Sequence, residues 1–596
     1  MKRRFILNFY YNYCFQMCDY FFENNEKYKF NIKRKIFLHF KKSQKIILIY
    51  IFFIIIIKNF LSFIFFLKKF NKLNKKNINF ILRIISKLKF LKTEKIDELF
   101  HALHVLVTIN NERIFFNKSP KKNINYKDIV YDAIIIGSGP SGAVTANELL
   151  SNGIRNILII EEGKKFNLPN LKHPGSEFYF KWKNSGLSSS LGKDLIQYSS
   201  GNCVGGGSEI NSGLCHDVDF EYLKSIYKND PDLKNFYDTN FLNSYLFDPH
   251  FTYLKDNHAR NFYRYFESGI SKTKWKFESL KKFSTLQNNK VKKNSMSETY
   301  LKQYLTKGGN ILENFKCIKI NKLKNNLISL DLLNKNKKIK INCKNVFICC
   351  GAPYSLQLLK QSKLVPNSLN NNFHFHPMVK IIAKYNQEVN PSKSGDVFNS
   401  QIVEFYPKYI FGNAASGEQF LRISTYGNSK AYLDVKKNFK KMTVYHSTFS
   451  LSSSSLKYIP FLQEHIIFNK FDKNQKKTIL EGVENLLKFI FFTGADYIYL
   501  GDEKSTKILP DQVKDITSII QNLKFKVSAV HLLGGLSMGN DKNDPLDLYG
   551  KLKESNYGIY VNDSSLLTNH LLKNPQSTVM QVANINTKNF IKNANI

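Results

Sequence analysis

The chain has 596 residues, 43% of them hydrophobic, which is enough for two or more packed domains. Its 88 Lys and Arg against 47 Asp and Glu give a net charge of +41, but the lysines are spread through the whole chain, so we expect no nucleic-acid partner. The eight cysteines include no CxxC pair and no Cys/His quartet with zinc spacing, and we therefore expect no metal site.

The N-terminal 125 residues form the most basic part of the chain. Residues 1–130 hold 27 Lys and Arg against 8 Asp and Glu, and residues 46–67 read IILIYIFFIIIIKNFLSFIFFL. This run is long enough to span a bilayer, but Lys58 and Asn59 near its centre are costly in hydrocarbon. A strained span, a hydrophobic hairpin at the membrane surface and a buried helix all remain open. We expect a membrane-associated or a cytoplasmic protein, and basic flanks on both sides leave the orientation of a span open.

The stretch IVYDAIIIGSGPSGAVTANELLSNGIRNILIIEEG reads as strand, glycine turn, helix and second strand. Gly137, Gly139 and Gly142 form a G-x-G-x-x-G motif, with Ser138 inside the turn. The three glycines allow a tight turn, close approach of the backbone to a pyrophosphate, and close packing of the helix on the strand. Glu161 ends the second strand, where a carboxylate binds a ribose hydroxyl. The segment predicts dinucleotide binding without separating NAD from FAD.

Three further segments with readable patterns follow along the chain. Residues 201–213 read GNCVGGGSEINSG, a loop whose consecutive glycines let a flat ligand or a phosphate contact the backbone. Residues 315–349 alternate as three or four short strands, which predicts an antiparallel meander returning to the main sheet before a helix in GAPYSLQLLKQS. Near the end, GIYVNDSSLLT predicts a strand ending in Asp563, and NPQSTVMQVANINTKNFI a turn that opens a terminal helix.

The histidines are the remaining candidates for catalysis or metal binding. His531 opens HLLGGLSMGN, so a glycine-rich turn holds it. His374 and His376 would share one face of a strand, but without a carboxylate or cysteine at ligand spacing we interpret them as structural. The adjacent Cys349 and Cys350 lie in an apolar run and are interpreted as core. The middle of the chain carries no readable motif.

Taken in order, these segments resemble the glucose-methanol-choline (GMC) oxidoreductase family of FAD-dependent flavoproteins. The loop GNCVGGGSEINSG resembles the first family signature, with Asn211 at its asparagine. NSMSETYLKQYL, FICCGAPYSLQLL and NFHFHP resemble family segments before and after the meander, and HLLGGLSMG, YVNDSSLLT and NPQSTVMQVAN resemble the C-terminal signature. The resemblance extends over about residues 126–596 and is weakest in the middle.

The resemblance implies FAD as the cofactor and gives roles to particular residues. It places the G-x-G-x-x-G residues and Glu161 on the ADP half, Cys317 at the adenine, the loop of Gly205 and Asn211 along the isoalloxazine, and Asp563 at the ribitol. It makes His531 the base beside the flavin and Asn574 the hydrogen-bond donor to the substrate oxygen. Some members attach the flavin through a histidine where this chain has Ile210, so we expect non-covalent FAD.

The expected fold is α/β, with a Rossmann-like FAD-binding domain, a discontinuous α+β substrate domain and a basic, partly hydrophobic N-terminal extension. The predicted divisions are 1–125 for the extension, 126–235, 295–374 and 525–596 for the FAD-binding domain, and 236–294 and 375–524 for the substrate domain. We expect oxidation of the CH–OH group of an alcohol, sterol or sugar-like small molecule, with an electron acceptor that the sequence does not identify. A flavin-containing lyase of the same family and a membrane-tethered, non-catalytic flavin-binding protein are the alternatives.

Overall fold

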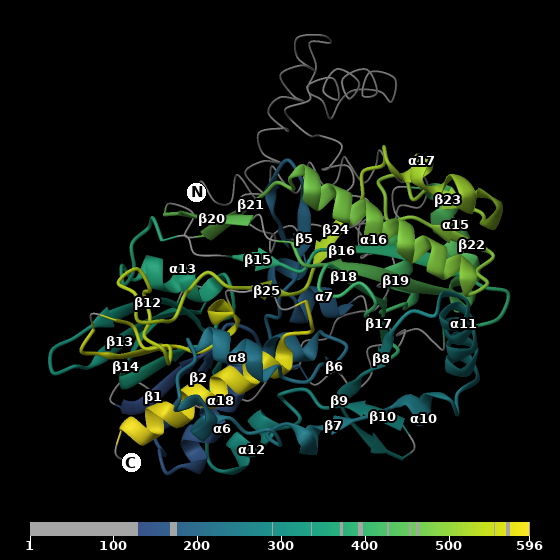
Figure 1. Cartoon of the computed structure of the whole chain (residues 1–596). Coiled ribbons are helices and arrows are strands. Elements are labelled where there is room, and N and C mark those ends of the chain that lie inside the picture. The colour runs from purple at the N-terminus through teal and green to yellow at the C-terminus, as the bar shows by residue number, and fades with distance from the viewer. Residues whose placement is uncertain are drawn as a thin grey trace, which may run out of the picture.

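The computed structural model describes residues 129–594, apart from short gaps (Figure 1). The gaps are 167–175, 187, 289, 335–336, 370–372, 391–396, 426–427, 452–453, 461–463, 554 and 568–571. Within the described part of the chain, no helix is long and apolar enough to cross a bilayer. The N-terminal extension and its hydrophobic segment 46–67 lie outside the described residues, so their predicted membrane association stays a prediction.

A seven-stranded sheet forms one half of the molecule. Its strands are β11 (Asn310–Glu313), β2 (Ile157–Glu161), β1 (Val130–Ile136), β14 (Lys337–Ile348), β13 (Ile328–Asn334) and β12 (Lys316–Lys322) in that order, with β26 (Gly558–Val561) also paired to β14. The pairs among β11, β2, β1, β14 and β26 are parallel. Three stretches far apart in the sequence therefore build one sheet.

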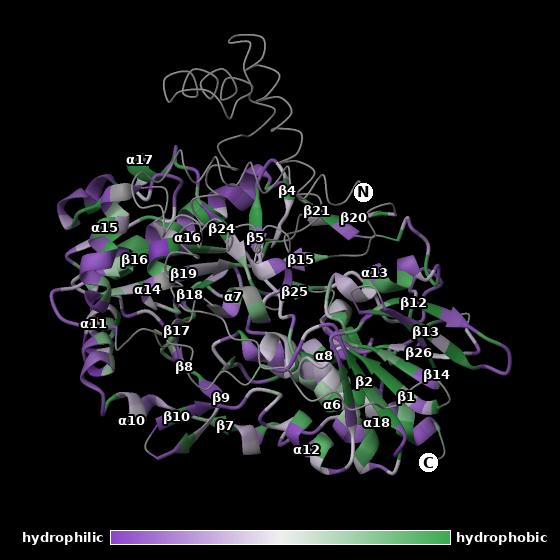
Figure 2. Ribbon diagram, turned by 180° about the vertical axis from the view of Figure 1, so that it is seen from behind, coloured by the Kyte–Doolittle hydropathy of each residue, from purple (hydrophilic) through white to green (hydrophobic). Residues whose placement is uncertain are grey.

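Alternate residues of the central strands bury two separate faces. Ala133 and Ile135 of β1 belong to a core that includes residues of α6 (Pro140–Ser151), α12 (Tyr300–Thr306) and α18 (Gln576–Asn593). Ile134 and Ile136 belong to the core on the opposite face, which includes residues of α13 (Tyr354–Gln361). A strand buried on both faces needs a continuous apolar run, which explains AIII in the sequence and the green strands in Figure 2.

The predicted meander is confirmed, with one difference. β12, β13 and β14 pair antiparallel in succession, but the run KIKIN and the first three residues of VFICC belong to the single 12-residue strand β14, which ends at Ile348. Its first half pairs with β13, and its second half pairs in parallel with β1 on one edge and β26 on the other. The polar residues between the two runs continue the strand because β13 and β1 supply backbone partners there.

A second, ten-stranded sheet forms the other half (Figure 1). Its order is β3 (Ser188–Ser189), β5 (Ile196–Tyr198), β24 (Val527–Ala529), β16 (Met378–Lys384), β19 (Met442–Phe449), β18 (Tyr409–Ala414), β17 (Ser400–Ile402) and β8 (Phe277–Ser279), with β22 (Tyr497–Tyr499) on β16 and β23 (Lys507–Ile508) on β22. The long helices α11 (Asn257–Thr273) and α16 (Lys473–Phe492) pack on one face. A Cβ on Gly482 of α16 would lie 2.5 Å from the Phe449 ring, so this helix lies close against β19.

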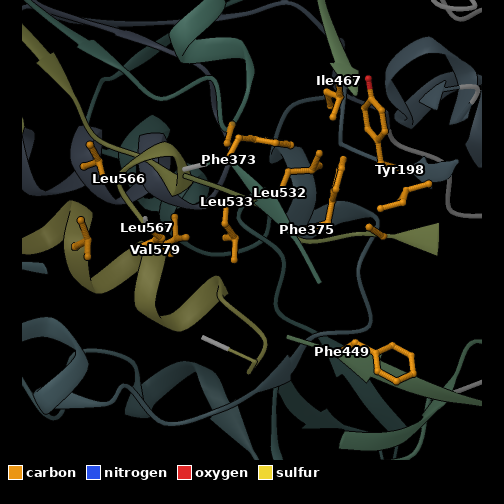
Figure 3. Packing of buried hydrophobic residues seen from close by; sticks show 14 of the residues in the cluster. Tyr198, Phe373, Phe375, Phe449, Ile467, Leu532, Leu533, Leu566, Leu567 and Val579 are labelled. Atoms are coloured by element: carbon orange, nitrogen blue, oxygen red, sulfur yellow. The ribbon is translucent and has the colours of Figure 1, made fainter. Parts of the chain in front are cut away.

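Smaller elements connect the two halves. The ribbon of β15 (His374–Phe375) and β25 (Leu532–Leu533) is antiparallel, and Figure 3 shows Phe373, Phe375, Leu532 and Leu533 together in the buried core beside it. Short sheets are formed by β6 (Leu214–Cys215), β7 (Leu246–Phe247), β9 (Lys281–Gln287) and β10 (Lys290–Lys293), and by β4 (Leu191–Gly192), β20 (Ser454–Ile459) and β21 (Glu464–Asn469). Further helices are α7 (Ser176–Lys181), α8 (Phe220–Ile226), α9 (Leu233–Phe236), α10 (His250–Tyr253), α14 (Glu418–Ser424), α15 (Ser429–Asn438) and α17 (Ile516–Ile520).

The predicted α/β fold class is confirmed, and the predicted domain divisions stay predictions. The strands β3, β5 and β24 come from stretches predicted for the FAD-binding domain, yet they pair within the second sheet. Both sheets therefore receive strands from the first and last parts of the described chain.

Candidate active site

A cavity of about 500 Å³ lies between the glycine turns of the first sheet and the strands of the second. Most of the predicted site residues line it, namely Gly137, Ser138, Gly139, Glu161, Asn211, Cys317, Asp563, His531 and Asn574. Gly142 and Gly205 do not. One continuous space therefore connects the predicted nucleotide-binding turn with the predicted catalytic histidine, and its size is typical of a ligand site.

The three glycines of the first turn are required for different structural reasons. Gly137 has a positive φ of 106°, and a Cβ there would lie 2.3 Å from the carbonyl oxygen of Cys349. A Cβ on Gly142 would lie 2.0 Å from the carbonyl oxygen of Gly137, so this glycine lets α6 pack against the turn. The protein itself leaves room at Gly139, because the heavy atom nearest to a Cβ built there would be the Cα of Gly206, at 3.9 Å. Gly139 thus meets the predicted requirement for a glycine that a ligand approaches.

Glu161 is buried at the end of β2 and holds the glycine turn in place. Its Oε2 accepts hydrogen bonds from the backbone N–H of Ser138 at 3.0 Å and from the Ser138 hydroxyl at 2.7 Å, and Oε1 accepts from the N–H of Gly163 at 2.7 Å. Burial raises the pKa of this carboxyl group. Because a carboxylate accepts about four hydrogen bonds, Oε1 keeps capacity for a ribose hydroxyl.

Ser138 also connects the first turn to the second glycine loop. Its hydroxyl oxygen accepts from the N–H of Gly205 at 3.1 Å. Gly205 has a φ of 93°, which shapes the loop, and the neighbouring residues Gly206 and Gly207 line the cavity. Asn211 lines the cavity and donates from Nδ2 to Oε1 of Gln576 at 2.6 Å, at the start of α18. The beginning of α18 is thereby fixed against this loop.

The two remaining predicted cofactor residues differ in what they offer. Cys317 lies on β12, the edge strand of the first sheet, beside a register shift between Cys317 and Lys319, and it lines the cavity. Asp563 is buried and its pKa is raised by burial. Its oxygens already accept from the N–H and hydroxyl of Ser565 at 2.9 and 2.6 Å, from the N–H of Gly351 at 2.7 Å and from the hydroxyl of Ser355 at 2.5 Å. A ribitol hydroxyl would compete with these donors, because four hydrogen bonds use a carboxylate's capacity.

His531 precedes the ribbon strand β25 and faces another histidine. Its Nδ1 lies 3.1 Å from Nδ1 of His376, and the two rings are nearly perpendicular. The pairing of β15 with β25 places Phe375 opposite Leu532 and so brings the two histidines together. Burial lowers the pKa of His531 to about 4. The ring is therefore neutral at pH 7, and its Nε2 can accept a proton when His376 accepts the Nδ1–H.

The glycine turn after His531 has the conformation that the sequence predicts. Gly534 and Gly535 have φ values of 74° and 106°, which other residues rarely adopt. The N–H of Gly534 donates to the carbonyl oxygen of Ser564 at 3.0 Å, so the turn is tied to the loop after β26. The contact with His376 was not predicted, because a two-residue ribbon is too short to produce a periodic signal.

Asn574 lies just before α18 and lines the same cavity as His531. Its backbone N–H donates to Nδ1 of His216 at 3.0 Å, and its side chain donates to the carbonyl oxygen of Leu214 at 3.4 Å. Burial, together with the charges of Lys573 and His531, lowers the pKa of His216 to about 3, so this imidazole is a neutral acceptor. The partner of His216 was not readable from the sequence.

The far wall of the cavity comes from the part of the chain without motifs. Lys380 on β16, Gln401 on β17 and His446 on β19 all line it. Sequence reasoning missed these residues because no local pattern distinguishes them from other strand residues. Among residues 129–594 outside the gaps, no group of His, Cys, Asp and Glu could hold a metal ion.

The fold and the cavity define a class of protein. A parallel sheet with a glycine turn at a helix N-terminus, and a histidine facing the same cavity from an opposing element, is an arrangement that suits a dinucleotide-dependent enzyme. The FAD binding domain family matches residues 130–170, and the GMC oxidoreductase family matches residues 275–378. These matches identify GMC-type oxidoreductase and FAD-binding segments in the chain and support FAD-dependent oxidoreduction.

Curated relatives agree with this assignment. An uncharacterized GMC-type oxidoreductase of Sinorhizobium fredii is 23% identical over 480 residues, which cover 76% of this chain and 93% of that protein. An uncharacterized GMC-type oxidoreductase of Mycobacterium tuberculosis is 30% identical over 86 residues, or 14% of each chain.

Two solved structures share the fold. Pyridoxine 4-oxidase from Mesorbium loti has a TM-score of 0.56 at 14% identity and covers 77% of this chain and 99% of its own. A formate oxidase variant from Aspergillus oryzae, solved to study FAD modification, has a TM-score of 0.57 at 12% identity and covers 78% and 98%. At these identities the likeness concerns the fold alone.

Proposed function

We propose that the protein oxidises the CH–OH group of a small alcohol to a carbonyl group. The observation that supports this most is His531, which lines the cavity that continues to the nucleotide-binding turn and whose Nδ1 is paired with His376 behind it. FAD, when bound, supplies the hydride acceptor. The residues fit this cofactor, because Gly139 leaves room for the pyrophosphate and Glu161 keeps an acceptor for the ribose.

The chain's own contribution is to hold the substrate and move its proton. Nε2 of His531 accepts the hydroxyl proton, since Nδ1 is engaged with His376. The Asn574 side chain hydrogen-bonds the substrate oxygen, and His216 fixes Asn574 through its backbone. A hydroxyl group gives up hydride readily only as its proton leaves, so the position of His531 determines the rate.

We also propose that FAD is bound non-covalently. Ile210 lines the cavity at the position where some relatives carry the linking histidine, and an isoleucine has no nucleophile. Acid precipitation of the purified protein is expected to leave all of the yellow colour in the supernatant. Flavin that remains with the pellet would show a covalent bond.

The direct experiment is anaerobic mixing of the purified yellow protein with a panel of alcohols. We expect the flavin absorbance to bleach with an accepted alcohol and the carbonyl product to appear in equal amount. His531→Ala is expected to keep the flavin spectrum and to reduce flavin about 10²- to 10⁴-fold more slowly. A lyase would convert its substrate without lasting bleaching, and a non-catalytic flavin-binding protein would give neither bleaching nor product.

A further inference from the structure

A row of residues crosses four neighbouring strands on the cavity wall. The register pairs Lys380 of β16 with His446 of β19, His446 with Gly412 of β18, and Gly412 with Gln401 of β17. Residues paired across strands project from the same face of a sheet. Lys380, His446 and Gln401 all line the cavity, while α16 packs on the opposite face of β19.

Gly412 has a specific effect in this row. A Cβ at this position would lie 2.8 Å from Nε2 of His446 and 3.4 Å from Nε2 of Gln401. The His446 ring therefore occupies the space above Gly412, close to Gln401. The Thr448 hydroxyl lies 2.9 Å from Nδ1 of His446 and fixes the ring from the other side.

Lys380 gives this wall a positive charge. No ion pair to Lys380 occurs among the described residues, and burial lowers its pKa without an opposing carboxylate. Lys384, on the same strand, shows the contrast, because its Nζ lies 2.6 Å from a carboxylate oxygen of Asp496. A partly buried ammonium group without a counter-charge is costly, and an anionic ligand would offset that cost.

The neighbours of Lys380 favour a group with one negative charge. Burial, together with the charges of Lys380 and His531, lowers the pKa of His446 to about 3, so His446 is neutral at pH 7. Gln401 is neutral as well. One ammonium group beside two neutral polar side chains matches a carboxylate, whereas a phosphate dianion would keep an uncompensated charge.

We propose that the substrate is a compact hydroxy acid whose carboxylate pairs with Lys380, beside His446 and Gln401. This rests on the proposed function, because it places the hydroxyl at His531. Lys380, His446 and His531 all line the same cavity. The carboxylate and the hydroxyl are thus held at two ends of a small molecule, and a sterol or another uncharged alcohol would leave Lys380 unpaired.

The test uses benzoate and benzamide, two probes of the same shape that carry no hydroxyl group. Binding to the FAD-loaded protein at pH 7.5 is followed by the change in flavin absorbance, so it is measured without turnover. We expect benzoate to bind about 10- to 100-fold more tightly than benzamide. Lys380→Gln should abolish this preference, Lys380→Arg should keep most of it, and the control Lys384→Gln, which removes the ion-paired lysine of the same strand, should leave it unchanged.

Equal wild-type affinity for the two probes overturns the proposal, and this comparison decides the matter even where Lys380→Gln loses its flavin. An unchanged preference in Lys380→Gln also overturns it. A shifted flavin potential with an unchanged preference would assign Lys380 to the cofactor instead of the substrate.

A second pair of probes separates this proposal from the proposed function. The two probes are 4-(hydroxymethyl)benzoate and 4-(hydroxymethyl)benzamide, and flavin bleaching is measured with each. Benzoate preference without bleaching by any alcohol would leave the anion site standing and refute alcohol oxidation. Bleaching by both alcohols at equal apparent affinity would support alcohol oxidation and refute the anion site.

Discussion

The state of His531 predicts an unusual pH dependence. Its pKa lies at about 4 instead of 6.5, because the cavity walls bury the ring. A tenfold change in proton affinity is equivalent to about 1.36 kcal/mol, so placing a proton on this ring costs at most about 3.4 kcal/mol more than in water. With a pKa of about 4, roughly nine-tenths of the rings are neutral at pH 5 and nearly all at pH 8.5.

The assay is anaerobic stopped-flow reduction of the flavin by an accepted alcohol between pH 5 and pH 8.5. We expect the rate to change less than about 1.5-fold over this range, since the base is already in its accepting form. A histidine with its ordinary pKa of about 6.5 would give a rise of roughly 30-fold. Asn574→Ala should be slower with the same flat profile, because it leaves the proton acceptor in place.

Two results would refute this reasoning. A rise of roughly 30-fold with a midpoint near pH 6.5 would mean that the cavity does not hold His531 neutral. An unchanged reduction rate in His531→Ala would mean that the histidine is structural.

Three further predictions concern the cofactor, acid stability and the membrane. Gly139→Ala should fold with unchanged thermal stability of the flavin-free protein but lose FAD. Gly142→Ala should instead damage the fold itself, because its Cβ would lie 2.0 Å from the Gly137 carbonyl oxygen. FAD retained by Gly139→Ala would contradict the placement of the pyrophosphate. His216, His446 and His465 have pKa values lowered to about 3 by burial, and His531 has one lowered to about 4. The unfolded chain therefore binds more protons below pH 6.5, and stability falls as the pH falls, by roughly 2 kcal/mol for each of the four histidines at pH 5. Urea unfolding at pH 7.5 and pH 5 measures this loss, and His465→Gln should reduce it by about a quarter. The full chain should sediment with anionic vesicles through residues 46–67, and a chain beginning at Asn123 should stay in the supernatant and still bind FAD; a full chain that stays in solution would refute the membrane prediction.

The sequence predicted those parts of the site whose chemistry is local. Gly137, Gly142 and Gly534 are required by the backbone within a few residues of themselves, so the motif alone reveals them. The helix α6, the meander and the terminal helix have periodic patterns of sufficient length. These features also fix the order of the segments along the chain, which is what made the family recognisable.

The residues of the proposed substrate site could not be predicted, because contacts between distant segments bring them together. Lys380, His446 and Gln401 are brought together by the register of four strands, and register depends on pairing between segments that no local pattern reveals. The contact of His376 with His531 depends on a ribbon of two residues per strand. Similarly, KIKIN and VFICC read as two strands because the partners that join them lie elsewhere in the chain.

The pairing of β14 has a consequence for synthesis of the protein in the cell. Its parallel partner β26 begins at Gly558, about 210 residues after β14 ends at Ile348. Ribosomes add roughly 5–20 residues per second, so the nascent chain carries an unpaired apolar strand edge for roughly 10 to 40 s. Exposed edges of this kind recruit other chains, so we expect this edge to be a site for chaperone binding during translation.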